Sequence, residues 1–208
     1  AASGILTLPS GILADSFVKH RPLIIGVAIL LGGLAYVLVS ISSVYGLVLL
    51  SLCLVGASSA FWHPSAVSSL STFFPDHRGT ALAVHGVGAS VGDAIGPVCI
   101  GALLLFASWQ QLAQWHLIPA VVLSIMVWAS TRGIFAGEAT RMDTGAYFAG
   151  LRDLVHHPSV FVVMSASSLV GMARLSTVTF LPLYIVEELG YSSAGLGFHW
   201  MLLYIMGT

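Results

Sequence analysis

The stretch Arg78–Ala107, RGTALAVHGVGASVGDAIGPVCIGALLLFA, contains after its first residue a single Asp, Glu, Lys or Arg, namely Asp93. Four of its six glycines recur at spacings of four or five residues: Gly88, Gly92, Gly96 and Gly101. Glycines four apart lie on nearly one face of an α-helix and let another backbone approach closely, which is how helices associate in lipid. Pro97 removes one backbone donor, a defect that membrane helices tolerate only where neighbouring groups satisfy the freed carbonyl. The stretch therefore predicts a close-packed helix that crosses a membrane.

The composition agrees with a membrane protein. Of the 208 residues, 57% are hydrophobic and only 7% are charged, whereas soluble domains carry about 25% charged residues. No Asp, Glu, Lys or Arg occurs from Pro22 to Pro75, a stretch too long for one crossing of about 20 residues and long enough for two. The net charge of −1 gives no indication of a nucleic-acid partner. We therefore expect an all-α protein that spans a lipid bilayer several times.

Apolar segments divide the chain into five complete crossings, 23–41, 45–72, 80–106, 112–131 and 159–185, and two incomplete ones, 1–14 and 193–208. We expect the first segment to close at Pro9 and Gly11, and the sequence Trp62-His63-Pro64 to interrupt the span 45–72. The chain begins without Met inside an apolar segment and ends inside another. We therefore expect it to be a fragment of a longer polypeptide.

The basic residues predict the orientation of these crossings. Six of the seven fall in alternate loops: Lys19, Arg21, Arg78, Arg132, Arg141 and Arg152. The intervening loops carry no Lys or Arg, and one of them contains Glu187 and Glu188. Because basic loops stay on the cytoplasmic side of a membrane, we expect these six residues to face the cytoplasm. The seventh, Arg174, lies inside a span.

The loop after the first segment resembles a motif of the major facilitator superfamily. That family has the pattern G-x-L-A-D-R-x-G-R-[RK] between its helices 2 and 3, and this sequence matches it at Gly11, Leu13, Ala14 and Asp15. Lys19 and Arg21 preserve the basic character of the pattern, as does Arg78 at the head of the glycine-rich helix. Ser16 and Val18 stand where the family has Arg and Gly, so we expect a weaker network of charges around Asp15. The resemblance implies that Gly11, Asp15, Lys19, Arg21 and Arg78 form a cytoplasmic gate.

Two further features resemble the same family. The glycine-rich helix with Gly88, Gly92, Gly96-Pro97 and Gly101 is similar to the helix-5 packing motif of the antiporters of the superfamily. The run Phe61-Trp62-His63-Pro64 in the preceding span resembles the fosmidomycin-resistance branch of its efflux transporters.

The resemblance implies a partial major facilitator fold, from helix 2 to the start of helix 8 of a 12-helix pattern. Residues 1–131 would then be part of an N-terminal six-helix bundle and residues 158–208 the start of a C-terminal one. Residues 132–157 would be the central cytoplasmic loop, in which Tyr147, Leu151, Leu154 and Val155 recur at the spacing of an amphipathic helix.

Three ionisable side chains near mid-depth of the expected spans are candidates for function. His63 is either a proton-binding or substrate-binding group or a histidine satisfied by a neighbouring helix. Arg174 stays charged at any pH at which the protein works and must meet a carboxylate, backbone carbonyls or an anionic ligand. Asp93 costs about 2.5–3.5 kcal/mol at bilayer depth, so such a residue is usually retained for a function.

The roles of these residues remain open at the level of sequence. Because burial favours the uncharged form of a carboxyl group, Asp93 is a candidate to carry the coupling proton, with His85 as an extension of the proton path. A permanent Asp93–Arg174 pair that joins two bundles is the alternative. Trp62 is a candidate for the wall of the substrate cavity, although a packing role for this aromatic ring is equally compatible with the sequence.

The leading hypothesis is a multi-pass protein of the plasma or inner membrane that exports a small organic molecule by proton antiport with alternating access. The same scaffold also performs symport or facilitated uptake, and a seven-helix receptor is a more distant alternative. No motif of a hydrolase, metal site or phosphate-binding loop occurs, so we expect no enzyme activity, no metal and no cofactor. The expected partners are the small-molecule substrate, protons and the lipid bilayer, and we expect the protein to act as a monomer.

Overall fold

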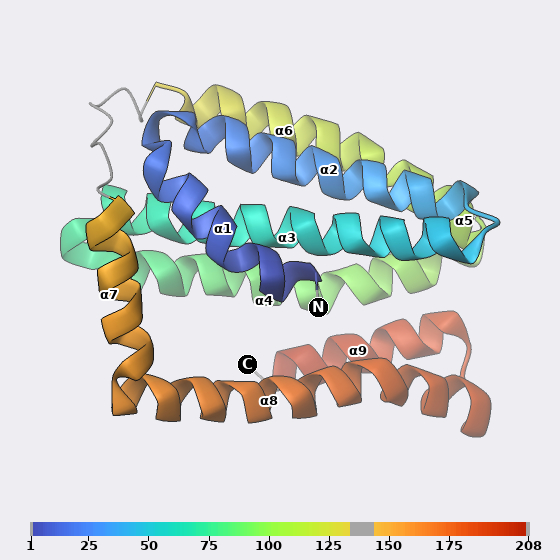
Figure 1. The fold of residues 1–208 in the computed structure, drawn as a ribbon. Coiled ribbons are helices and arrows are strands. Elements are labelled where there is room, and N and C mark those ends of the chain that lie inside the picture. The colour runs from blue at the N-terminus through green and yellow to red at the C-terminus, as the bar shows by residue number, and fades with distance from the viewer. Residues whose placement is uncertain (1, 134–143, 207–208) are drawn as a thin grey trace. The chain divides into compact units, whose positions relative to one another are not determined.

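The computed structural model describes residues 2–133 and 144–206, and these residues form helices joined by short connections, with no strand among them (Figure 1). Five stretches are long and apolar enough to cross a membrane: Val18–Ile41, Tyr45–Phe73, Pro75–Leu103, Trp109–Thr131 and Pro158–Glu188. The expectation of an all-α protein with five complete crossings is therefore confirmed.

The chain divides into two compact units, and the division falls inside one helix. The first unit holds residues 1–92 and 106–140, and the second holds residues 93–105 and 141–208. The helix α4 (Arg78–Leu103) contributes its first half to one unit and its second half to the other.

The first unit also contains α1 (Ala2–Ser16), α2 (Arg21–Ile41), α3 (Tyr45–Phe73), α5 (Trp109–Trp115) and α6 (Leu117–Thr131), with the one-turn 3₁₀ helices η1 (Val18–His20) and η2 (Pro75–His77). Helix α2 packs against α3 and against α5 and α6, and α1 packs against α3 (Figure 1). In the second unit, α7 (Thr144–His156) leads into α8 (Pro158–Leu183), which continues as the π-helix η3 (Tyr184–Glu188) before α9 (Ser193–Met206).

Small residues bring the helices of the first unit together. A Cβ atom built on Gly33 of α2 would lie 2.5 Å from the Cβ atom of Ala120 of α6. The hydroxyl of Ser124 donates a hydrogen bond of 2.8 Å to the Gly26 carbonyl, and Ser58 of α3 donates one of 2.7 Å to the Ala28 carbonyl. Small residues and interhelical bonds from Ser are the usual means of helix association in a membrane.

Three local expectations from the sequence are wrong. Helix α1 continues through Pro9 and Gly11 to Ser16, and α3 continues through Pro64, so neither helix ends or breaks at its proline. Glu187 and Glu188 belong to the π-helix, and the turn follows them at Gly190, whose positive φ of 70° favours glycine. Residues 134–143 of the expected central loop, which include Arg141, lie outside the described residues.

Candidate functional site

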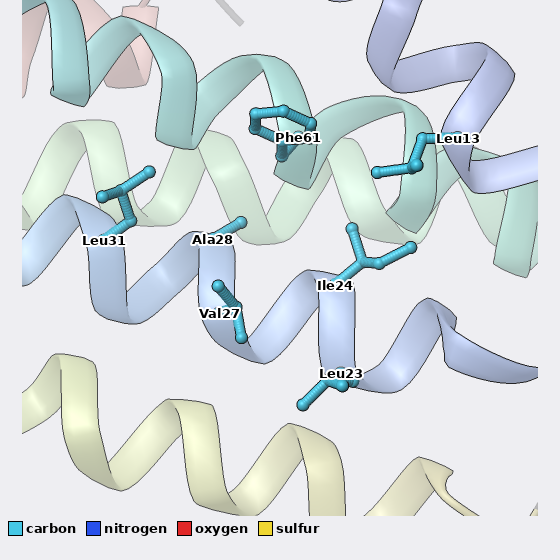
Figure 2. A pocket seen from close by; sticks show the side chains of 7 residues that line it. All are labelled: Leu13, Leu23, Ile24, Val27, Ala28, Leu31 and Phe61. Carbon is cyan, nitrogen blue, oxygen red and sulfur yellow. The ribbon is translucent and has the colours of Figure 1, made fainter. Parts of the chain in front are cut away.

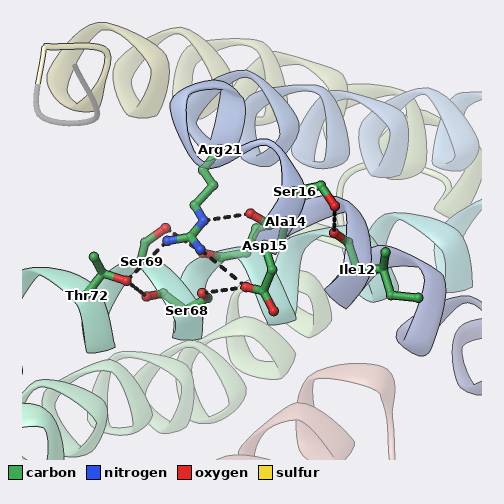
Figure 3. Close-up of polar contacts among 9 residues, drawn as sticks. Ile12, Ala14, Asp15, Ser16, Arg21, Ser68, Ser69 and Thr72 are labelled. Carbon is green, nitrogen blue, oxygen red and sulfur yellow. Dashed lines mark hydrogen bonds and ion pairs between the residues drawn. The ribbon is translucent and has the colours of Figure 1, made fainter. Parts of the chain in front are cut away.

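A buried arginine joins three helices at one end of the first unit (Figure 3). The guanidinium of Arg21, the first residue of α2, donates from Nε to the Ala14 carbonyl of α1 at 2.9 Å. Its Nη1 donates to Thr72 Oγ1 of α3 at 3.2 Å, and its Nη2 lies 3.3 Å from Asp15 Oδ1. The Ser68 hydroxyl of α3 donates to the same Asp15 oxygen at 3.2 Å. We call Asp15, Arg21, Ser68 and Thr72 the Arg21 cluster.

The chain path explains why Arg21 can reach all three helices. The single turn η1 reverses the chain between α1 and α2, so Arg21 begins a helix directly beside the end of the preceding one. Arg21 is 4% exposed, and a buried guanidinium is tolerated only where its charge and its donors are met. Asp15 supplies the opposite charge, and the Ala14 carbonyl and the Thr72 hydroxyl accept two further hydrogen bonds. The cluster therefore fixes the ends of α1, α2 and α3 together.

The remaining residues of the expected gate are not part of this cluster. Lys19 of η1 and Arg78, the first residue of α4, are exposed, and neither forms an ion pair within the described part of the chain. Gly11 lies inside α1, where a Cβ atom would meet no described atom within 4 Å.

A second group of sequence-predicted residues comes together between α3 and α4. The ring centroid of His85 lies 6.1 Å from that of His63 and 6.1 Å from that of Trp62. The three side chains come from two neighbouring helices of the first unit. Two imidazoles and an indole thus lie close together inside apolar spans.

A groove of about 440 Å³ opens beside His63 between α1 and α3. Its lining combines hydroxyl, imidazole and apolar groups: Thr7, Ser59, Ala60, His63, Pro64 and Val67. Hydroxyl and imidazole groups both donate and accept hydrogen bonds, so Thr7, Ser59 and His63 supply the polar groups of an otherwise apolar groove.

The second unit holds the remaining pair of candidates. Arg174 Nη2 of α8 lies 3.4 Å from Asp93 Oδ2 of α4, and both side chains are exposed. The separation is longer than the 2.7–2.9 Å of a strong charge-assisted bond. The two side chains thus form a loose ion pair within the second unit.

The glycines of α4 differ in their surroundings. No described atom lies within 4 Å of a Cβ atom built on Gly88, Gly92 or Gly96, whereas Gly101 is buried. The close backbone approach to this helix occurs at Pro97, where a Cβ atom added to Gly197 of α9 would collide with the Pro97 carbonyl oxygen. Gly197 is thus a packing residue of α4 that the sequence reading did not identify.

An apolar cavity of about 280 Å³ lies between α1, α2 and α3 (Figure 2). It is lined by Leu13, Leu23, Ile24, Val27, Ala28, Leu31 and Phe61. Because this lining offers no polar side chain, the cavity provides no hydrogen bond that would select a polar substrate. Among the described residues, no three His, Cys, Asp or Glu side chains gather in a geometry that could hold a metal ion.

Sequence reasoning missed the serines and threonine that complete these sites. Ser68 and Thr72 belong to the Arg21 cluster, and their spacing of four places both on one face of α3. Ser10 is fully buried and donates a hydrogen bond of 2.6 Å to the Ala60 carbonyl. Pro64 was the available signal for Ser10, because a proline inside a membrane helix requires an outside donor for a freed carbonyl.

Comparison with known proteins identifies a family and two relatives. The profile of the Major Facilitator Superfamily matches residues 1–208. The chain is 25% identical over 197 residues to the fosmidomycin resistance protein of Escherichia coli (strain K12), a match that covers 92% of this chain and 47% of that protein. It is 29% identical over 112 residues to an uncharacterized MFS-type transporter of Mycobacterium tuberculosis (strain ATCC 25618 / H37Rv), covering 53% of this chain and 19% of that protein.

No solved structure matches the chain significantly. The chain spans about half the length of the first of these relatives and a fifth of the second.

Proposed function

Because the chain belongs to the major facilitator superfamily of membrane transporters, we propose that it exports a small organic molecule in exchange for protons by alternating access. The family and the named relatives indicate a multi-pass membrane transporter rather than an enzyme. Export is supported by the resemblance to a fosmidomycin resistance protein. We further propose a monomer in the plasma or inner membrane.

The observation that carries the antiport proposal is the loose pair of Asp93 and Arg174. In the proposed cycle the deprotonated Asp93 carboxylate accepts a hydrogen bond from a polar group of the substrate, while Arg174, which keeps its charge throughout, holds the carboxylate in place. A proton that binds Asp93 from the outer side removes this acceptor and displaces the substrate. Release of the proton on the cytoplasmic side restores the carboxylate for the next substrate molecule. Because proton and substrate occupy Asp93 alternately, their fluxes run in opposite directions.

The two histidines offer a second place for the proton. His63 and His85 lie beside each other between α3 and α4, with Trp62 against His85. His63 also borders the groove lined by Thr7 and Ser59. In the proposed cycle these two imidazoles share one proton. Trp62 and His63 line part of the path along which the substrate moves.

We assign the Arg21 cluster a role in the conformational change between the two states of the transport cycle. In transporters of this family, two bundles alternate between states that open on opposite sides of the membrane. We assign residues 1–131 to the first bundle, residues 158–208 to the second and residues 132–157 to their connection. The cluster, with Gly11, Lys19 and Arg78 around it, would hold the cytoplasmic end of the first bundle rigid while the gate closes.

Proteoliposomes that contain the protein at its natural length test this proposal, with fosmidomycin as the probe. Transport against the probe's own gradient should appear when protons flow in the opposite direction, and a protonophore should abolish it. Transport that is equally fast without a pH gradient would identify a facilitator, and transport in the same direction as the protons would identify a symporter. Either result contradicts antiport.

A further inference from the structure

Helix α3 contains a defect in its backbone hydrogen bonding at Pro64. A proline has no N–H group, so the carbonyl four residues earlier loses its partner within the helix. That carbonyl belongs to Ala60, which is buried against α1. A carbonyl without a partner is costly where water is absent, yet the helix runs unbroken from Tyr45 to Phe73.

The missing donor comes from the neighbouring helix. Ser10 of α1 is fully buried, and its Oγ atom donates to the Ala60 carbonyl oxygen at 2.6 Å. The same Oγ atom lies 2.8 Å from the Thr7 carbonyl oxygen of its own helix. A serine hydroxyl has one proton, so the Thr7 and Ala60 carbonyls compete for it.

This junction lies beside a side chain to which the proposed function assigns a role. His63 directly precedes Pro64, and both residues line the groove of about 440 Å³ together with Thr7 and Ala60. His85 of α4 is the ionisable group next to His63, whereas the groove residues from α1 and α3 are otherwise uncharged. A movement of α3 at its weakest point would therefore move His63 relative to His85 and the groove.

We propose that Ser10 is a positioning residue for His63. With its proton on the Ala60 carbonyl, Ser10 ties α3 to α1 at the Pro64 defect and sets the place of His63 in the groove. With its proton turned to the Thr7 carbonyl, Ser10 stays hydrogen-bonded while α3 is released. The inference rests on the proposed function only in giving His63 a part in transport.

A set of variants of the natural-length protein tests this role with fosmidomycin as the probe. Ser10→Ala should raise KM about tenfold, the change expected when a buried group loses its hydrogen-bond partner, and should shift the pH profile of transport toward that of His63→Gln. Ser10→Thr keeps a hydroxyl and should preserve both properties. Pro64→Ala restores the backbone donor, so Ser10→Ala should have a much smaller effect in that background.

Ser58→Ala is the matched control. Ser58 also donates across a helix interface, to the Ala28 carbonyl, but the residue four positions later is Gly32, whose N–H remains available to that carbonyl. Ser58→Ala should therefore leave KM and the pH profile unchanged. An equal loss in Ser58→Ala, or an equal effect of Ser10→Ala with and without Pro64, would overturn the proposed role.

A stability measurement separates this inference from the transport proposal. In detergent, Ser10→Ala should lower the Tm more in the wild-type background than in the Pro64→Ala background, whether or not fosmidomycin is a substrate. Recovery of folded protein in the double variant supports the inference even if Ser10→Ala alone does not fold. Additive changes in Tm would contradict it, and failure of wild-type fosmidomycin transport would contradict only the choice of substrate.

Discussion

At the scale of single residues, the buried serines of α3 differ in how their hydroxyl groups are satisfied. Ser51 and Ser69 donate to carbonyls one turn earlier in the helix, Leu47 at 2.7 Å and Ser65 at 2.5 Å. The Ser65 hydroxyl is fully buried and has no hydrogen-bond partner among the described residues.

Ser65→Ala should therefore raise stability. A buried polar group without a partner costs about 1–3 kcal/mol, so its removal should increase the free energy of unfolding by about 1 kcal/mol. Thermal unfolding of the purified protein in detergent measures the change. Ser51→Ala is the control and should not stabilise the protein, because it removes a hydroxyl that is already bonded. A loss of stability in Ser65→Ala would show that this hydroxyl has a partner in the working protein.

The Asp93–Arg174 pair supports a second prediction at this scale. Asp93→Asn keeps the size of the side chain and removes the group that binds the proton. Transport driven by a pH gradient should be lost, whereas substrate binding and passive exchange should persist. Reconstituted vesicles, assayed with and without the gradient, distinguish the two activities.

A purely structural role of the Asp93–Arg174 pair predicts a different experimental result. If Asp93 serves only to neutralise Arg174, Asp93→Asn should reduce the amount of folded protein, and adding Arg174→Gln should restore it. Gradient-driven export that survives in a well-expressed Asp93→Asn protein would contradict both roles.

At the scale of helices, the interface between α2 and α6 has no room for an added methyl group. Gly33→Ala places a Cβ atom 2.5 Å from the Ala120 Cβ atom and 3.5 Å from Leu117 Cα. These atoms are fixed by the backbone, so the helices must separate, which typically costs about 1–3 kcal/mol. Gly46→Ala at the start of α3 meets no described atom within 4 Å and should not destabilise the protein. Equal stability of the two variants in detergent would show that α2 and α6 can move apart freely.

The helices followed from the sequence because the membrane imposes one strong constraint, a run of apolar residues about 20 long. The expected span 45–72 became α3, and 23–41 became α2. The span near 112–131 starts earlier, since Ser108 and Gln111 form a capping box that begins α5. The expected break at Pro64 is wrong because Ser10 donates a hydrogen bond to the Ala60 carbonyl, which the proline leaves without its usual partner in the helix.

The site was harder to predict because the sequence does not determine which faces of different helices meet. The sequence alone identifies four ionisable side chains in apolar segments: Asp93, Arg174, His63 and His85. Ser10 and Thr72 carry no such signal, because serine and threonine are common at membrane helix interfaces. Their hydrogen bonds depend on how α1, α2 and α3 pack against one another, and the sequence does not show this packing.

At the scale of the whole molecule, the number of crossings and the basic residues together predict which loops share a side of the membrane. Four spans separate Ser16, at the end of α1, from the region that holds Thr140, which lies outside the described residues, so both should lie on the same side. The fifth span, Pro158–Glu188, should bring Ser192 to the opposite side. Because six of the seven Lys and Arg residues lie at the ends of these spans or between them on the first side, that side should be the cytoplasm.

Cysteine labelling of the natural-length protein tests this topology. With the native cysteines Cys53 and Cys99 replaced, a single cysteine at Ser16 or at Thr140 should react with a membrane-impermeant thiol reagent only when the cytoplasmic side is accessible, as in inverted vesicles. A cysteine at Ser192 should react in intact cells, since Ser192 is exposed between η3 and α9. Labelling of permeabilised cells provides the control, because all three positions should then react. Reaction of the cysteines at Thr140 and Ser192 from the same side would mean that the segment 158–188 does not cross the membrane, and the transporter topology would be wrong.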